Sequence, residues 1–255
     1  MIQPLEAARD ARGWRAKFGV LGPSTNTIVQ PDFDDLRPWG VTNHYSRIAV
    51  QDVPVDSDDS FLALTTAISG ALNQAVDEVM TCAPDYMVMG MSAIAFYGGR
   101  AGGERFAREV SERAQGLGVS TGALATAAAL EVQGAKRIAF LSPYYPVANA
   151  AVRRFLEDSG FTVVRDACLR CASPRAIADT GVARLRQVIR ELDGDDVDAI
   201  VQVGTNLSMM KFAAAAEIFL GKPVIAINTA TYWHALRQCG FADKIPGFGA
   251  LLERY

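Results

Sequence analysis

Short apolar runs alternate along the chain with longer stretches in which apolar residues recur at helical spacing. Most of the short runs are apolar on both faces, which is typical of parallel strands covered by helices on both sides. Strands are expected at residues 18–21, 41–50, 86–89, 138–141, 162–165, 199–203 and 224–227. Helices are expected at residues 60–81, 103–117, 147–159, 173–192 and 229–239. The alternation of the two predicts an α/β fold.

The pattern of the first half of the chain returns in the second half. Three pairs of segments match in the same order: 17–23 with 137–143, 84–90 with 197–204, and 120–134 with 226–240. The matches imply two copies of one strand-loop-helix layout. We therefore expect two similar lobes, each a parallel sheet flanked by helices, related by pseudo-twofold symmetry with one site between them.

The lobe boundaries follow from the repeat. The N-terminal lobe is expected to cover residues 1–119, with the chain returning to it at 226–255, and the C-terminal lobe to cover residues 120–225. In open parallel sheets, ligands bind beyond the carboxyl ends of the strands. Two facing lobes would thus enclose a site made of four loops, at residues 22–27, 90–98, 142–149 and 204–208.

These four loops carry groups that bind anions. The first offers hydroxyls, an amide and backbone N–H groups near a helix start, and the third adds a phenol. The second and fourth begin with glycine, which lets the backbone approach a ligand closely. The candidate catalytic residues are Ser92, Tyr144, Gly90 and Gly204, and the candidate substrate-binding residues are Ser24, Thr25, Asn26, Met91, Thr205 and Asn206. The alternative for each loop is structural: a capped turn, a packed tyrosine or a glycine that relieves a tight turn.

Composition narrows the classes of partner. Half of the 255 residues are hydrophobic, enough for a sizeable core without a metal or disulfide. The net charge of −3 comes from acidic and basic residues mixed along the chain, without the basic stripe that nucleic acid or an anionic membrane requires. No apolar run approaches the roughly 20 residues that span a bilayer, and residues 1–17 lack the apolar core of a signal peptide. We therefore expect a cytoplasmic protein with neither nucleic-acid nor membrane partners.

The cysteines and histidines do not indicate a metal site. Cys168 and Cys171 form a C-x-x-C pair, but no second pair or nearby histidine completes four ligands. None of the four cysteines is expected at a strand-end loop. A histidine is a frequent acid or base in catalysis, but nothing places His44 or His234 at the cleft, and a packed or surface position is expected for both. We expect no metal and no cofactor.

Several short motifs occur together and in order along the chain. They are 23–27 (PSTNT), 90–92 with 96–98, 142–144 with Asn149, 155–157 with 160–161, 223–230 with Trp233, and 246–249 (PGFG). This set resembles the cofactor-independent aspartate/glutamate racemase superfamily, especially its maleate cis-trans isomerase and arylmalonate decarboxylase branches. The resemblance covers nearly the whole chain. It implies an enzyme that acts on a small dicarboxylate, with Asn26 at the place of a carboxylate-binding asparagine and Tyr144 at that of a substrate-binding tyrosine.

The sequence departs from this family at two positions. The resemblance places two catalytic cysteines of the racemases and maleate isomerases where this chain has Gly90 and Gly204. Arylmalonate decarboxylases resemble the chain at Gly90 but keep the second cysteine. Without thiols, covalent addition and two-base racemisation lack their reacting groups. Decarboxylation depends mainly on hydrogen-bond donors for an enediolate and on an apolar pocket.

The favoured expectation is therefore an arylmalonate-decarboxylase-like lyase, with water or the phenol of Tyr144 as the proton source. Two alternatives stay open. One is an isomerase or racemase of the same family that works without the cysteine pair, and the other is a carboxylate-binding protein without catalysis. A homodimer is the oligomeric state considered.

Overall fold

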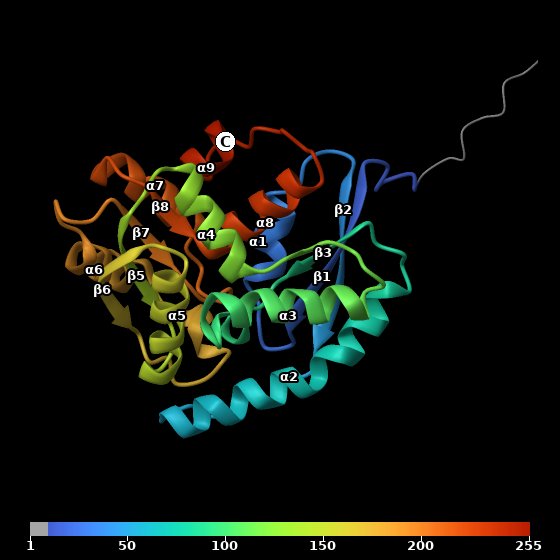
Figure 1. The fold of residues 1–255 in the computed structure, drawn as a ribbon, viewed down its shortest axis with the longest axis horizontal. Helices are drawn as coiled ribbons and strands as arrows, with labels where there is room; N and C mark the ends of the chain where they lie inside the picture. The colour runs from blue at the N-terminus through green and yellow to red at the C-terminus, as the bar shows by residue number, and fades with distance from the viewer. Residues whose placement is uncertain (1–9) are drawn as a thin grey trace, which may run out of the picture.

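The computed structural model describes residues 10–255, and the strands of this part of the chain form two separate parallel sheets. The first sheet has the order β2-β1-β3-β4 and the second β6-β5-β7-β8, so both halves have the same topology. Figure 1 shows the first sheet on the right and the second on the left. The strands are β1 Ala16–Pro23, β2 Val41–Ile48, β3 Tyr86–Met89, β4 Val119–Ser120, β5 Arg137–Ser142, β6 Thr162–Cys168, β7 Ala199–Gln202 and β8 Val224–Ala226. The expected α/β fold with two similar sheets is confirmed.

Helices cover the sheets and connect their strands. They are α1 Val29–Asp35, α2 Asp58–Met80, α3 Gly99–Arg113, α4 Gly122–Val132, α5 Pro146–Asp158, α6 Val182–Leu192, α7 Met210–Leu220, α8 Ile227–Gln238 and α9 Ala250–Arg254, with 3₁₀ helices η1 Ala93–Phe96 and η2 Ala176–Asp179. The single helix expected over 173–192 is wrong, because η2 ends before Thr180 and Gly181 is the extended residue that precedes α6. Glycine in a helix interior costs conformational entropy, and here it separates the two elements. No helix in residues 10–255 is long and apolar enough to cross a membrane.

The central strands are buried on both faces. Phe18, Val20 and Leu21 of β1 are fully buried, as are Ile138, Ala139, Phe140 and Leu141 of β5. Both strands lie second in their sheets, each between two parallel neighbours. Their carboxyl ends therefore reach the same edge of each sheet as the ends of the neighbouring strands.

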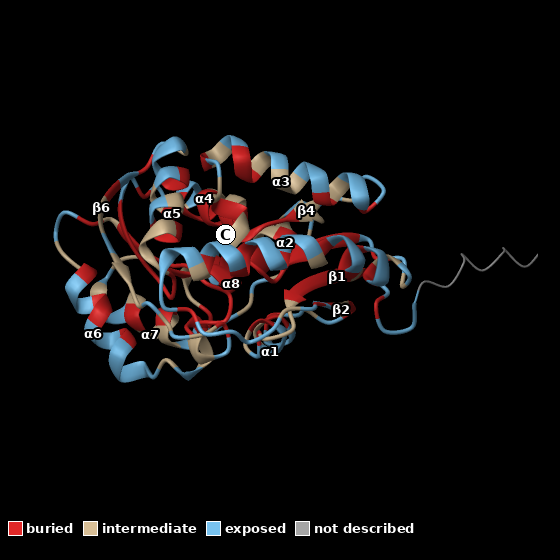
Figure 2. Ribbon diagram, turned by 90° about the horizontal axis from the view of Figure 1, so that it is seen from below, coloured by how far each residue is buried: buried red, intermediate tan, exposed pale blue. Residues whose placement is uncertain are grey.

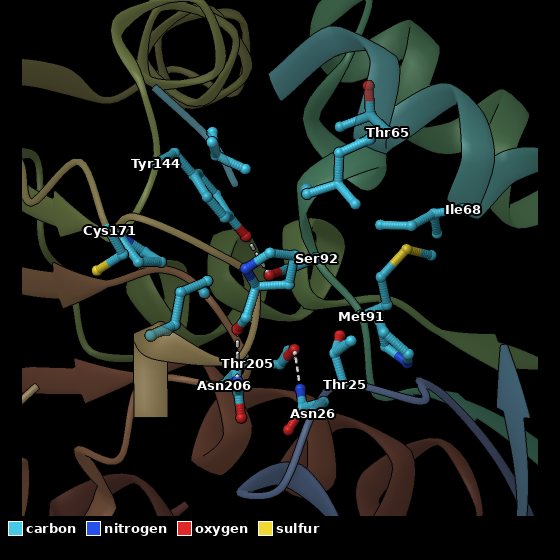
Figure 3. A pocket seen from close by; sticks show the side chains of 18 of the residues that line it. Thr25, Asn26, Thr65, Ile68, Met91, Ser92, Tyr144, Cys171, Thr205 and Asn206 are labelled. Atoms are coloured by element: carbon cyan, nitrogen blue, oxygen red, sulfur yellow. Dashed lines mark hydrogen bonds between the residues drawn. The ribbon is translucent and has the colours of Figure 1, made fainter. Parts of the chain in front are cut away.

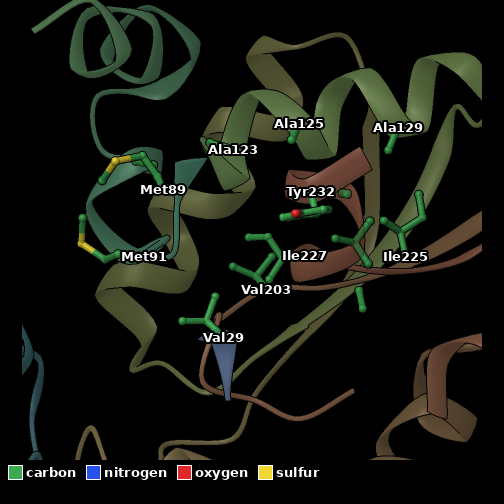
Figure 4. Close-up of a cluster of buried hydrophobic side chains, with 14 of the residues drawn as sticks. Val29, Met89, Met91, Ala123, Ala125, Ala129, Val203, Ile225, Ile227 and Tyr232 are labelled. Carbon is green, nitrogen blue, oxygen red and sulfur yellow. The ribbon is translucent and has the colours of Figure 1, made fainter. Parts of the chain in front are cut away.

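Helices α4 and α8 pack against each other at the junction of the two halves. Helix α8 also contacts α1, β3 and β4, so the chain returns to the first half near its C-terminal end. Figure 4 shows the apolar side chains at this junction, where Met89 and Met91 lie in the same cluster as Val203 and Ile227. One hydrophobic core therefore continues from one half into the other, which limits movement between them.

Helix α2 and the segment before it connect the first half to the second. The backbone N–H of Val55 donates to Ala172 O over 2.7 Å, and the Tyr145 hydroxyl donates to Val55 O over 2.8 Å. Asp52 pairs with Arg175 at 3.1 Å. Figure 2 shows that α2 has an exposed outer face and a buried inner face. The first turns of α2 thus form a cover held by both halves.

Candidate functional site

A cavity of about 70 Å³ lies between the two halves, at the carboxyl ends of the strands. It is lined by loops that follow β1, β3, β5 and β7, as expected from the repeat (Figure 3). The expected site residues that line it are Thr25, Asn26, Met91, Ser92, Tyr144, Gly204, Thr205 and Asn206. The fold therefore brings together groups that are far apart in the chain, as the bond between Asn26 and Thr205, 179 residues apart, shows.

Two expected residues, Ser24 and Gly90, do not line the cavity. The Ser24 hydroxyl donates to Val50 O over 2.9 Å and accepts the Val50 N–H over 3.0 Å, so it ties the loop after β1 to the end of β2. Arg47 donates to the carbonyls of Ser24 and Asn26 and holds the same loop from outside. Gly90 contributes its carbonyl to the network described below. Both residues support the loops of the site without contacting the cavity.

Ser92 and Tyr144 form a buried pair of hydroxyls in the cavity wall. Their oxygens lie 2.7 Å apart, and the two residues are 1% and 5% exposed. Burial raises the pKa of the Tyr144 phenol well above its ordinary value, so the phenol stays protonated at neutral pH. One hydroxyl donates to the other, and the second proton of the pair remains for a ligand. Figure 3 shows the Tyr144 ring directed toward Ser92.

Thr205 links three of the strand-end loops. Its hydroxyl accepts from Asn26 Nδ2 over 3.0 Å and donates to Gly90 O over 3.0 Å. The other side-chain atom of Asn26, Oδ1, accepts the N–H groups of Ile28 and Val29 at the start of α1. Most of the hydrogen-bonding groups of the Asn26 side chain are therefore used within the protein, and one amide N–H remains for a ligand.

Asn206 also acts between the halves. Its Oδ1 accepts the Thr27 N–H over 3.0 Å and its Nδ2 donates to Pro174 O over 2.8 Å. The side chain of Asn206 is thus occupied on both ends. Its role in the site is mainly to hold the loop after β1 and the segment after β6 in place.

The backbone supplies further donors at both glycine-led turns. Within residues 10–255, the N–H groups of Met91 and Ser92 after β3, and of Thr205 and Asn206 after β7, donate to no protein acceptor. All four residues line the cavity. Consecutive unpaired N–H groups are well suited to bind an anion. The two halves thus offer equivalent pairs of donors.

The opposite wall is apolar and was not expected from the sequence. Val55, Phe61, Leu64 and Ile68 line the cavity from the segment before α2 and from its first turns, together with Thr65, whose hydroxyl donates to Leu62 O over 2.8 Å. The Phe61 and Tyr144 ring centroids lie 5.3 Å apart. No Asp, Glu, Lys or Arg belongs to the lining in the described chain. This wall could have been expected from the predicted parallel sheet, because β2 also ends at this edge of the sheet.

Cys171 also lines the cavity, so the expectation that no cysteine lies at a strand-end loop is wrong. Strand β6 ends at Cys168, and the segment after it runs along the loop after β5, where the Cys171 N–H donates to Pro143 O over 3.0 Å. Its Sγ lies 3.7 Å from Thr180 Oγ1, and burial raises the pKa of the thiol. In Figure 3 the sulfur points away from the hydroxyl pair.

The histidines lie elsewhere. His44 pairs with Thr42, and His234 Nδ1 lies 2.7 Å from Ser120 Oγ, where burial lowers the pKa of the imidazole. Neither lines the cavity. In the described part of the chain, no three His, Cys, Asp or Glu side chains lie together as a metal site would require.

Both strand-tip glycines are closely surrounded. Gly204 has φ of +103°, and a Cβ added there would lie 2.5 Å from Cγ and Cδ of Pro143. A Cβ added at Gly90 would lie 2.9 Å from Tyr45 Oη and 3.0 Å from Leu21 O. In this backbone, neither position has room for a side chain.

Comparison with known proteins places these features in a family. Residues 51–252 match the family model described as arylmalonate decarboxylase. The chain belongs to the arylmalonate decarboxylase family. It is 26% identical to a maleate isomerase of Pseudomonas putida, over 93% of this chain and 97% of the relative. It is also 27% identical to an arylmalonate decarboxylase of Bordetella bronchiseptica, over 65% of this chain and 70% of the relative.

Solved structures agree with this assignment. A maleate cis-trans isomerase of Nocardia farcinica with a covalently bound succinylcysteine intermediate superposes with a TM-score of 0.84 at 24% identity, covering 94% of this chain and 98% of that one. A liganded double mutant of arylmalonate decarboxylase gives a TM-score of 0.79 at 21% identity, covering 94% and 99%. These likenesses confirm the fold. The expectation of an enzyme, a lyase or an isomerase, is confirmed by the family and its relatives.

The crowding around Gly204 predicts that adding a side chain there destabilises the fold by more than the strain of a positive φ alone. Gly204→Ala is expected to lower the free energy of unfolding by roughly 2–4 kcal/mol, because overlap with Pro143 adds to the strain of a positive φ. Gly134→Ala is the matched control, since Gly134 has φ of +71° and nothing within 4 Å of the added Cβ. It should cost only about 1–2 kcal/mol. Urea denaturation measures both, and equal costs would show that Pro143 does not restrict position 204.

Proposed function

We propose that the chain is a cofactor-independent lyase that decarboxylates a small malonate-like dicarboxylate. The observation that carries the proposal is the division of the cavity into a wall of neutral hydrogen-bond donors and an opposite apolar wall without charged side chains. The donors are the Ser92–Tyr144 pair, the free N–H groups at the two turns and the remaining amide N–H of Asn26. The apolar wall comes from Phe61 and its neighbours on α2.

This division suits the chemistry of carbon dioxide loss. The bond between the central carbon and one carboxylate breaks, carbon dioxide leaves, and the electron pair moves into an enediolate formed with the other carboxylate. Donors fixed around that second carboxylate stabilise the growing charge on its oxygens. An apolar wall beside the departing carboxylate disfavours its charge and favours neutral carbon dioxide. The central carbon then takes a proton, from water or from the Tyr144 phenol.

The size of the cavity favours a substrate with a small substituent. An engineered protein cavity of about 150 Å³ holds one benzene molecule. The cavity here, at about 70 Å³, is less than half as large. Even malonate has more non-hydrogen atoms than benzene, so binding a dicarboxylate requires α2 to move away from Tyr144. A methyl group on the central carbon requires less movement than a phenyl group.

We predict that the purified protein releases carbon dioxide from methylmalonate with a kcat/KM at least about tenfold above that for phenylmalonate, since forcing an oversized group into a packed wall costs about 1–3 kcal/mol. Carbon dioxide release is measured with a coupled pH-indicator assay. Faster turnover of phenylmalonate would show that α2 does not limit substrate size.

The same reaction run in deuterium oxide separates the rival functions. Exchange of deuterium into the substrate without carbon dioxide release would indicate a racemase or isomerase. A dicarboxylate that raises the melting temperature but is never converted would indicate a binding protein. Either result would replace the lyase.

The hydroxyl pair is expected to matter more for turnover than for folding. Ser92→Ala or Tyr144→Phe should lower kcat by about 10²–10³, as removal of one oxyanion donor typically does. Tyr86→Phe is the matched control, because the buried Tyr86 hydroxyl lies 3.2 Å from Ser120 Oγ and Tyr86 does not line the cavity. It should lose a similar amount of stability with little loss of kcat. Parallel losses of kcat and melting temperature in all three variants would assign the pair a structural role.

A second candidate function is an isomerase, and Cys171 is the observation that favours it. Isomerisation of a double bond by covalent addition needs a nucleophile at the cavity, and Cys171 is the one thiol that lines it in the described chain. The raised pKa of this thiol and its contact with Thr180 weigh against that role, because the thiolate is the reactive form.

Cys171→Ser decides between the two. On the lyase proposal, the variant should keep kcat for methylmalonate within about threefold, because serine retains the volume and the contact with Thr180. A maleate assay, in which the fumarate formed is quantified by chromatography, is run on both proteins. Maleate isomerisation that disappears in the variant would favour the isomerase.

A further inference from the structure

Asn228, the second residue of α8, does not line the cavity but holds a residue that does. Its Nδ2 donates two hydrogen bonds, one to Thr205 O over 3.0 Å and one to Asp32 Oδ2 over 2.8 Å. Asn228 is 1% exposed; its bond to Thr205 is buried, and its bond to Asp32 is partly buried. The amide thus connects the turn after β7 to a carboxylate on α1, in the other half of the molecule.

Thr205 is consequently fixed from three directions. Its hydroxyl contacts Asn26 and Gly90, and its carbonyl is held by Asn228. The backbone N–H groups of Thr205 and Asn206, which are free to bind an anion, belong to this same turn. A rotation of the peptide that joins Thr205 to Asn206 would redirect the Asn206 N–H. The carbonyl bond from Asn228 opposes that rotation.

We propose that Asn228 and Asp32 are positioning residues, which orient the donors of the Gly204–Asn206 turn toward the substrate carboxylate when Asp32 is ionised. This inference rests on the proposed anion-binding role of the turn. It does not depend on whether the bound dicarboxylate is then decarboxylated or isomerised.

The orientation of the Asn228 amide depends on the charge of Asp32. An ionised carboxylate accepts from Nδ2 and strengthens the bond. A proton on Asp32 Oδ2 would instead set two donors against each other. The amide relieves this conflict by turning Oδ1 toward Asp32, and Oδ1 has no partner among the described residues. That turn removes Nδ2 from the Thr205 carbonyl.

The surroundings of Asp32 bring the protonation of its carboxylate into the range of ordinary pH. Burial raises the pKa of Asp32 to about 6, with Asn228 lowering it, Asp35 raising it and Lys211 of α7 lowering it. Tyr45, the titratable neighbour on β2, stays neutral because burial raises the pKa of its phenol. The carboxylate is therefore ionised at pH 8 and mostly protonated at pH 5.

Stability changes in the opposite direction from the expected activity. The folded chain binds the Asp32 proton more tightly than the unfolded chain, whose aspartate has a pKa of 3.8. The contribution of Asp32 to stability is therefore largest below pH 3.8 and is lost as the pH rises through about 6. A loss of binding or turnover as the pH falls through 6 is thus not explained by unfolding through this group.

The test compares wild type with Asp32→Asn, Asn228→Ala and the control Asp35→Asn between pH 5 and 8. The readouts are the affinity for malonate by calorimetry and the kcat and KM for methylmalonate. Wild type should lose kcat/KM as the pH falls through about 6, and Asp35→Asn should show the same loss at a lower pH, because the Asp35 charge raises the pKa of Asp32. Asp32→Asn should lack this step and have kcat reduced between about 10- and 100-fold at pH 8, the range that a misplaced binding group costs. Asn228→Ala should be equally impaired at every pH.

The design separates the failure of this inference from that of the proposed function. The substrate titrates identically with every variant, so a difference between profiles belongs to the protein. Asp32→Asn removes a buried charge, and its melting temperature should be equal to or above that of wild type. Identical pH profiles of wild type and Asp32→Asn would overturn the positioning role. Malonate binding without decarboxylation would overturn the lyase alone, and absence of any dicarboxylate binding would overturn both.

Discussion

The geometry of the cavity depends on one buried hydroxyl, that of Thr205. The two sheets share no strand pairing, so no backbone ladder sets how their strand tips face each other. The Thr205 hydroxyl supplies that constraint by accepting from Asn26 after β1 and donating to the carbonyl of Gly90 after β3. Both bonds are shielded from water, and breaking either one would leave a buried polar atom unpaired, at a cost of about 1–3 kcal/mol. These two hydrogen bonds therefore fix the ends of β1, β3 and β7 relative to one another.

Under the proposed function, a second constraint is that the cavity binds charged carboxylates although no charged side chain belongs to its described lining. Arg47 lies near, but its guanidinium is bonded to the carbonyls of Ser24 and Asn26 and so stabilises the loop rather than a ligand. The donors that remain are neutral, and the protein network already holds them in place. Fixed dipoles need little reorganisation when charge develops on a substrate oxygen. The apolar wall from α2 keeps water away from them and so increases their effect.

Much of the fold was predictable because buried parallel strands have continuous apolar runs, and the repeat then located the loops after β1, β3, β5 and β7. The pattern missed α7, whose alanine-rich sequence is nearly uniformly apolar, and it joined η2 to α6 across Gly181. The apolar wall and Cys171 were missed for a different reason. They follow β2 and β6, whose ends reach the cavity only because these strands pair in parallel with β1 and β5. Strand neighbours of this kind are a property of the tertiary structure and leave no local mark on the sequence.

The strand tips at matching places of the two halves both carry glycine, and this affects how the two turns can bind a ligand. Side chains at these tips would meet Tyr45 and Pro143, and the two residues that follow each glycine line the cavity with unpaired backbone N–H groups. Two equivalent turns then present two equivalent pairs of N–H groups, which suits a dianion with two like carboxylates. The side chains break this equivalence, because Ser92 belongs to a hydroxyl pair that has one proton to share, whereas Asn206 at the matching place is occupied by Thr27 and Pro174. Under the proposed lyase function, one substrate carboxylate is therefore held by more donors than the other. In that reaction, this difference determines which carboxylate keeps its charge and which is left beside the apolar wall, where loss of carbon dioxide relieves it.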